Sequence, residues 1–104
     1  MFNTLEELYD YYNYNIINID KYKLYEKEIL DMFNNKNIEQ YTNNDDLFFW
    51  IGRYYEKIEK DYDKMKEYFL MAIDKGNLNA MFNLAIYYKN IEKDYNKMKK
   101  YYLM

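Results

Sequence analysis

The sequence contains no cysteine, histidine, serine or proline, and only two glycines among its 104 residues. Without cysteine it has no disulfide framework and no thiolate to bind a metal. Without histidine and serine it lacks the usual zinc ligands and most pairs of a nucleophile with a base. These absences point away from the common hydrolases and from zinc enzymes. We therefore expect no catalytic residue, no metal site and no cofactor.

The sequence also lacks a long apolar run. No stretch approaches the ~20 apolar residues that a membrane-spanning helix needs. The first residues, MFNTLEELYDYY, carry acids where a secretory signal carries positive charge and an apolar core. We expect an intracellular, cytoplasmic protein that is not secreted and has no membrane contact. If the chain is viral, the host cytoplasm or the virion would be its location.

The composition is typical of one folded domain, but its charge is uneven. Half of the residues are hydrophobic and 32% are charged. Residues 1–50 carry four lysines against ten acidic residues, a net charge of −6, whereas residues 76–104 carry five lysines against two acidic residues, a net charge of +3. This gradient either guides end-to-end association or only solvates the surface. The overall charge of −3 argues against a nucleic-acid partner.

One stretch of the sequence occurs twice. IEKDYDKMKEYFLM begins at Ile58, and IEKDYNKMKKYYLM begins at Ile91, thirty-three residues later. Over residues 51–71, thirteen of twenty-one positions are identical to the position thirty-three residues further on. A period in this range is typical of stacked helical repeats. Residues 45–104 are therefore predicted to form two repeats of period 33, the last one incomplete.

Each repeat is predicted to form two antiparallel helices. Apolar residues recur at helical spacing over residues 45–57 and again over residues 78–89. Asp61 is a candidate N-cap of the second helix, and Gly76 is a candidate stop because the residue after a helix often has a positive φ. The short IEKD turn between the two helices favours an antiparallel pair.

The amino-terminal third is less regular. TLEE, beginning at Thr4, has the form of a capping box and predicts a helix to about Tyr14. A second helix is predicted from about Lys21 to Phe33, with Asp20 as a possible cap. We interpret residues 1–44 as an amino-terminal helical cap or as a degenerate repeat, and the sequence leaves both open.

The stretch KDYDKMKEYFLMAIDKGNLNAMFNLAIYY resembles the Sel-one-like repeat, a relative of the tetratricopeptide repeat. The positions that match the family pattern are Gly52, Lys60, Asp61, Tyr62, Lys64, Tyr68, Phe69, Ala72, Gly76, Asn77, Ala80, Leu84 and Tyr88. The sequence is rich in tyrosine, asparagine and lysine, and in this it is similar to repeat proteins from giant amoebal viruses. The resemblance implies an all-α fold, a short right-handed α-solenoid of antiparallel helix pairs, and a scaffold or adaptor role.

Two further patterns have a structural and a functional interpretation. Asp61 and Asp94 recur once per repeat at the turn, which capping explains better than catalysis. KKYYLM, beginning at Lys99, mixes lysines with rings that could stack on bases. Most tyrosines fall on the repeated apolar face, however, so we expect them to pack in the core.

One helix face differs between the repeats while the opposite face is nearly copied. The candidate binding residues on this stripe are Asp46, Trp50, Arg53, Lys57, Asn83, Ile86 and Asn90. Packing positions must repeat because each unit buries the same face, so a variable stripe faces solvent or a ligand. An exposed Trp50 would be a typical interface anchor, although it could instead pack on the amino-terminal helices. Drift of an uncommitted surface explains the difference as well.

The second copy stops at Met104, the counterpart of Met71. We expect part of the last helix to stay uncovered, at the candidate self-association residues Tyr95, Met98, Tyr102 and Leu103. Either the chain is a piece of a longer array, or another copy or a partner covers this end. The expected function is a non-catalytic protein–protein interaction module, an adaptor or scaffold. The alternative is a structural subunit that forms homo-oligomers through its open carboxy-terminal repeat.

Overall fold

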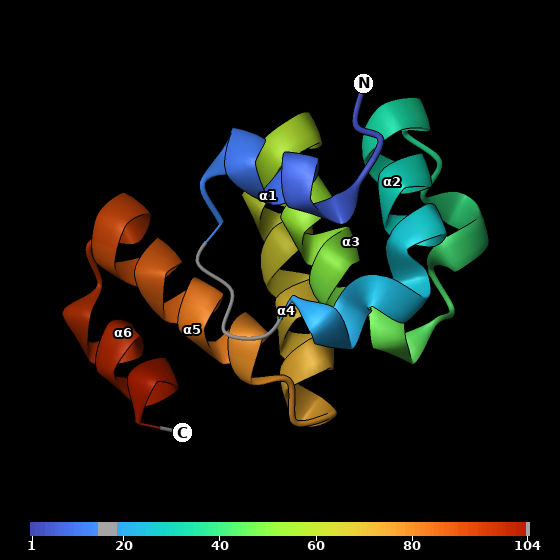
Figure 1. The fold of residues 1–104 in the computed structure, drawn as a ribbon. Coiled ribbons are helices and arrows are strands. Elements are labelled where there is room, and N and C mark those ends of the chain that lie inside the picture. The colour runs from blue at the N-terminus through green and yellow to red at the C-terminus, as the bar shows by residue number, and fades with distance from the viewer. Residues whose placement is uncertain (15–18, 104) are drawn as a thin grey trace.

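The computed structural model describes residues 1–14 and 19–103. In these residues the chain is all-α, without a strand, as the sequence predicted (Figure 1). The α-helices are α1 (Leu5–Tyr12), α2 (Glu26–Asn35), α3 (Phe48–Tyr54), α4 (Tyr62–Asp74), α5 (Leu78–Tyr87) and α6 (Tyr95–Tyr102). The shorter elements are the 3-10 segments η1 (Asp20–Tyr25), η2 (Glu39–Tyr41) and η3 (Asp45–Leu47) and the π-helical turns η4 (Tyr55–Glu59) and η5 (Tyr88–Glu92).

The helix pairs α3–α4 and α5–α6 share two contacts between rings, displaced by thirty-three residues. In each pair, two tyrosine rings stack with their centroids 5.6 Å apart, Tyr55 on Tyr68 and Tyr88 on Tyr101. A second contact between rings also recurs. The ring centroids of Phe49 and Phe69 lie 5.8 Å apart in the first pair, and those of Phe82 and Tyr102 lie 5.9 Å apart in the second. The repeat in the sequence is therefore a repeat in the structure.

The predicted caps and the predicted stop of the second helices are confirmed, whereas the α-helices of α3 and α5 end earlier than residues 57 and 89. The Asp61 carboxylate accepts a hydrogen bond of 3.1 Å from the backbone N–H of Lys64, and Asp94 accepts the same bond from Lys97. Gly76 follows α4 with a φ of 82°, a conformation that glycine adopts at little cost. These caps and this stop explain why α4 and α6 begin, and α4 ends, where they do.

The turns inside the two helix pairs have a geometry that the sequence did not predict. α3 and α5 each end in a π-helical turn, and Lys60 and Lys93 then adopt the left-handed conformation with a φ of 54°. The backbone N–H of Asp61 donates to the carbonyl of Tyr55 at 2.9 Å, which closes the turn. A lysine thus occupies a position where a glycine would be less strained.

The amino-terminal third departs from the prediction in its second helix. The Thr4 hydroxyl caps α1, as expected, by accepting a 3.1 Å hydrogen bond from the backbone N–H of Glu7. The helix expected from Lys21 instead begins as the 3-10 segment η1, which has no side-chain cap at its start. This segment directs Tyr22 into the core, where its ring stacks on Phe49 with the centroids 5.7 Å apart.

The helices pack mostly on their neighbours in the chain. α3 packs on α4, α4 on α5 and α5 on α6. Figure 1 shows α2 at one end of this row, α6 at the other, and α1 lying over the middle. The radius of gyration of 13.1 Å matches the ~13 Å of a compact domain of this length, so the row is short and closely packed. No helix of the described residues is both long enough and apolar enough to cross a bilayer.

Candidate interaction surfaces

The centre of the predicted binding stripe lies in the core. Trp50 is fully buried, and Arg53 and Asn83 are also buried. The Trp50 ring stacks on Tyr9 of the amino-terminal segment, with the centroids 5.6 Å apart. These three residues are therefore not open to a partner: Tyr9 and Tyr14 of the amino-terminal segment contact Trp50 and Arg53, and Asn83 bonds to Arg53 and to the carbonyl of Asn79. For Trp50, the alternative of packing on the amino-terminal helices is the one found.

Arg53 is held by a set of neighbours that replace water. Its guanidinium carbon lies 3.8 Å from the centroid of the Tyr14 ring, an arrangement of the cation–π kind. Its Nη1 donates to the Glu56 carboxylate at 2.8 Å and also to the side-chain oxygen of Asn83. Burial raises the pKa of the Tyr14 phenol, so the ring stays neutral beside this cation. Arg53 thus links the amino-terminal segment to both helix pairs.

The outer members of the stripe remain at the surface. Asp46 and Asn90 are exposed, while Lys57 and Ile86 are half-buried. They flank the buried centre, so the structure does not bring the seven predicted residues together as one open face. The differences between the repeats at Trp50 and Arg53 reflect contact with the amino-terminal third, a partner that only one of the two repeats has beside these positions.

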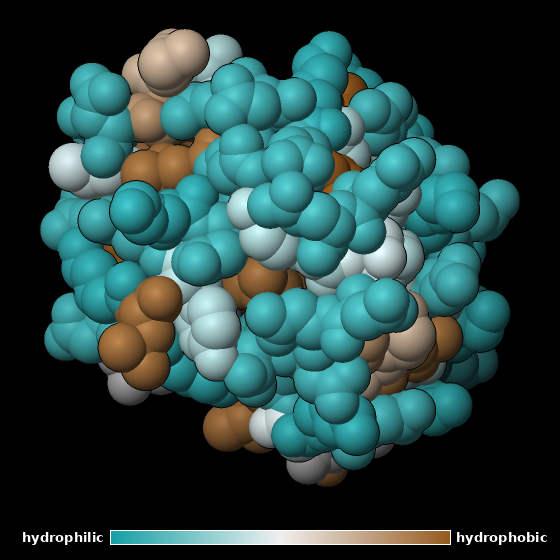
Figure 2. Space-filling model, turned by 90° about the vertical axis from the view of Figure 1, so that its right-hand side faces the viewer, coloured by the Kyte–Doolittle hydropathy of each residue, from teal (hydrophilic) through white to brown (hydrophobic). Residues whose placement is uncertain are grey.

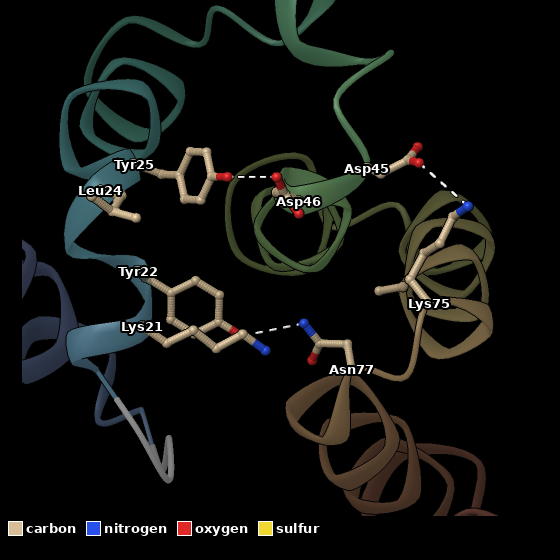
Figure 3. A pocket seen from close by; sticks show the side chains of 9 residues that line it. Lys21, Tyr22, Leu24, Tyr25, Asp45, Asp46, Lys75 and Asn77 are labelled. Atoms are coloured by element: carbon tan, nitrogen blue, oxygen red, sulfur yellow. Dashed lines mark hydrogen bonds and ion pairs between the residues drawn. The ribbon is translucent and has the colours of Figure 1, made fainter.

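A cavity of about 270 Å³, lined by both polar and apolar side chains, lies where the amino-terminal third meets the repeats (Figure 3). Two neighbouring acids point in different directions there: the Tyr25 hydroxyl donates to Asp46, and Lys75 lies 3.3 Å from the carboxylate of Asp45. This hydrogen bond to Asp46 raises the pKa of Tyr25. On the opposite wall, the side chain of Asn77 donates to a tyrosine hydroxyl of η1 at 3.2 Å.

Most polar groups of this cavity already bind one another. These contacts connect η1 and η3 to the turn between α4 and α5. Sequence reasoning missed it because its residues come from separate stretches of the chain and share no motif. In the residues that the structure describes, no three acidic side chains lie close enough to hold a metal ion.

Several apolar side chains of the last helix pair are open to solvent. We call this region the carboxy-terminal surface, and it consists of Leu78, Met81, Phe82, Tyr95, Met98, Tyr102 and Leu103. Leu78 is 63% exposed, Tyr102 45% and Leu103 84%. A groove of about 240 Å³ runs between α5 and α6, lined by Leu78, Met81, Phe82, Tyr101 and Tyr102. Exposed apolar side chains gathered in this way are typical of an interaction site.

The four candidate self-association residues all belong to this surface. Tyr95, Tyr102 and Leu103 are exposed and Met98 is half-buried. Sequence reasoning missed the contribution of α5. A signal was present, because Leu78, Met81 and Phe82 follow one another at spacings of three and one and so share a helix face.

The opposite end of the row has a different character. Figure 2 looks onto that end, from the side of α2, and shows a face that is mainly hydrophilic with separate apolar patches. Such a polar outer face is what a terminal element of a helical stack needs in water. The two ends of the molecule are therefore unlike: one is covered by polar side chains, and the other carries the apolar groove.

Comparison with known proteins adds no family. No protein-family model, no curated protein and no solved structure matches the chain. What stands is an all-α domain of sequentially packed helix pairs, with two structurally similar pairs at its carboxy-terminal side.

Proposed function

We propose that the chain is a non-catalytic protein–protein interaction module, an adaptor or scaffold. On this proposal its two helix pairs belong to a short α-solenoid of Sel-one-like repeats. The observation that carries the proposal is the carboxy-terminal surface. Its groove combines aromatic, aliphatic and methionine side chains, which are the usual contents of the centre of a protein interface.

The comparison of the two helix pairs supports this interpretation. Phe69 in α4 is fully buried, whereas Tyr102, its counterpart in α6, is 45% exposed. The difference arises because α5 packs on α4 while no element of the described residues packs in the same way on α6. The surface is thus built like an interior contact between neighbouring helices, but it is open.

Affinity capture with variant baits tests the proposal. The full chain, the Tyr102→Glu variant and the Leu24→Glu variant would each be used to recover proteins from the same cells. Leu24 is 85% exposed on η1, far along the chain from the groove, and serves as the matched control. We expect the wild type and Leu24→Glu to recover the same proteins, and Tyr102→Glu to lose them. Recovery of the same proteins by all three baits would contradict a role for this surface.

A second candidate function is a structural subunit that assembles with copies of itself. The observation that favours it is the charge of the two ends of the sequence, −6 over residues 1–50 and +3 over residues 76–104. Sedimentation equilibrium at several concentrations distinguishes the two functions. Self-assembly predicts a mass above the 13.2 kDa of the single chain, and a return to that mass in Leu103→Glu.

A further inference from the structure

We propose that the carboxy-terminal surface docks one α-helix of a partner protein, and that an acidic residue of this helix pairs with Lys99. The inference rests on the proposed interaction function and specifies the chemistry of the partner. The inference comes from comparing the two helix pairs: α4 carries a surface that matches the one on α6, and α5 packs on it.

The docked helix is α5, which packs on α4. The residues of α4 on the contact face are Tyr62, Met65, Lys66 and Phe69, which recur on α6 as Tyr95, Met98, Lys99 and Tyr102. Met65 and Phe69 are fully buried in the first pair. On the α5 side, Ala80 and Leu84 are fully buried too. They share a helix face with Tyr87, whose ring contacts Tyr62 of α4 with the centroids 5.6 Å apart, so we assign both to the apolar side of the contact.

Lys66 forms the polar side of the same contact. Its ammonium lies 3.1 Å from the Glu92 carboxylate, at the end of the π-helical turn that follows α5, and 5.4 Å from the centroid of the Tyr87 ring. The Tyr87 hydroxyl donates to the same carboxylate at 3.0 Å. The hydrogen bond from Lys66 lowers the pKa of Glu92, so this acid stays ionised in the contact.

Lys99 occupies on α6 the position that Lys66 occupies on α4. In residues 1–14 and 19–103, no acidic side chain forms an ion pair with Lys99. The apolar neighbours Tyr95 and Tyr102 are exposed on the same helix face. The surface therefore has the apolar part and the cation of the first contact, and no helix or acidic residue of the part of the chain that the structure describes docks on it.

The first contact defines the sequence of a matching helix. Its contact residues are Ala80, Leu84, Tyr87 and Glu92, so the pattern is a small residue, a leucine four positions later, a tyrosine three positions later and a glutamate five positions later. The small residue lets the helix backbone approach the aromatic rings closely. The glutamate and tyrosine together receive the lysine.

A second copy of the chain fits the surface less well. α6 presents Lys97, Lys99 and Lys100, with no acidic residue in its last two turns, so pairing two α6 helices would place like charges together. If two copies instead stacked end to end, the mainly hydrophilic face at the α2 end of one copy would lie on the groove of the other (Figure 2). A separate helix with an acidic residue avoids both problems.

Binding of a synthetic peptide to the full chain tests the inference. The probe is a labelled peptide with the sequence of residues 77–93, since that segment already docks on α4. Fluorescence anisotropy should show saturable binding to the wild type, weakened at least about ten-fold by Tyr102→Glu. Lys99→Glu should weaken binding about two- to five-fold, and a peptide with Glu92→Lys should restore it in that variant. Lys27→Glu on α2 is the matched control and should change nothing.

Several results would overturn the inference. One is a peptide that does not bind the wild type, and another is an affinity that Tyr102→Glu leaves unchanged. A third is that the peptide with Glu92→Lys binds the Lys99→Glu variant no better than the unchanged peptide does. A dimer of the wild type in the absence of peptide, lost in Tyr102→Glu, would assign the surface to a second copy. If the peptide fails while Tyr102→Glu still abolishes capture of proteins from cells, the docked-helix inference falls and the interaction function stands. Circular dichroism of each variant confirms that the helices are intact.

Discussion

Gly52→Ala should destabilise the fold, although alanine is the better helix former. A methyl group at residue 52 would lie 2.5 Å from Cδ1 and 2.7 Å from Cε1 of Phe69. Carbon atoms normally approach to about 3.5–4.0 Å, so the ring would have to move by roughly 1 Å. Phe69 has no free space, because it is fully buried and stacked on Phe49 with the centroids 5.8 Å apart.

The magnitude follows from two opposing effects. Overpacking of a core contact costs about 1–3 kcal/mol, and replacing glycine within a helix returns about 0.5–1 kcal/mol. The two ranges leave a net loss of about 0–2.5 kcal/mol, with about 1 kcal/mol as the central expectation. Each kcal/mol lowers the melting temperature of a domain near this size by roughly 4–8 °C.

Thermal and urea denaturation followed by circular dichroism measure this loss. The double variant with Phe69→Leu provides the control, since the smaller side chain makes room for the new methyl group. A double-mutant cycle should then give a favourable coupling between the two substitutions. A melting temperature of Gly52→Ala at or above that of the wild type would refute the argument, because it would mean that Phe69 moves aside freely.

Three further predictions follow from buried or strained residues. Trp50→Ala should lower the free energy of unfolding by about 3–5 kcal/mol and reduce helicity, since Trp50 is fully buried; unchanged helicity in circular dichroism would contradict its place in the core. Lys60→Gly should raise the free energy of unfolding in urea by up to about 1 kcal/mol, because the residue has a φ of 54°, and a loss of stability would argue against that conformation. Burial and the hydrogen bond to Glu59 raise the pKa of Tyr54 above its ordinary value of 10.0, so its contribution to stability is complete below pH 10.0 and is lost as the pH rises above it. Urea denaturation on either side of this pH should show the loss, and Tyr54→Phe should diminish it.

The repeats were predictable from the sequence because local rules agree there. The copied apolar positions, the caps at Asp61 and Asp94 and the stop at Gly76 each depend on neighbours within a few residues. The helix boundaries of α4 therefore follow from propensity, capping and periodicity alone. The 3-10 geometry of η1 does not, since it depends on the contact between Tyr22 and Phe49, which come from distant parts of the chain.

The candidate surfaces were predictable only in part. A stripe that varies between repeats was expected to face solvent, but variation arises also where one repeat contacts an element that the other lacks. Trp50 and Arg53 vary for this reason, because Tyr9 and Tyr14 of the amino-terminal segment cover them. The exposed face of α6 was predicted correctly at Tyr95, Tyr102 and Leu103, and the first two of these residues match by position the face of α4 that another helix covers.

Site-specific photo-cross-linking tests most directly whether the carboxy-terminal surface binds a partner. A photoreactive amino acid would replace Tyr102 in one variant and Leu24 in another, both exposed in the free chain. We expect a discrete adduct with a different protein from position 102, through a helix that carries an acidic residue, and none from position 24. An adduct of twice the mass of the chain, or equal labelling from both positions, would contradict this expectation.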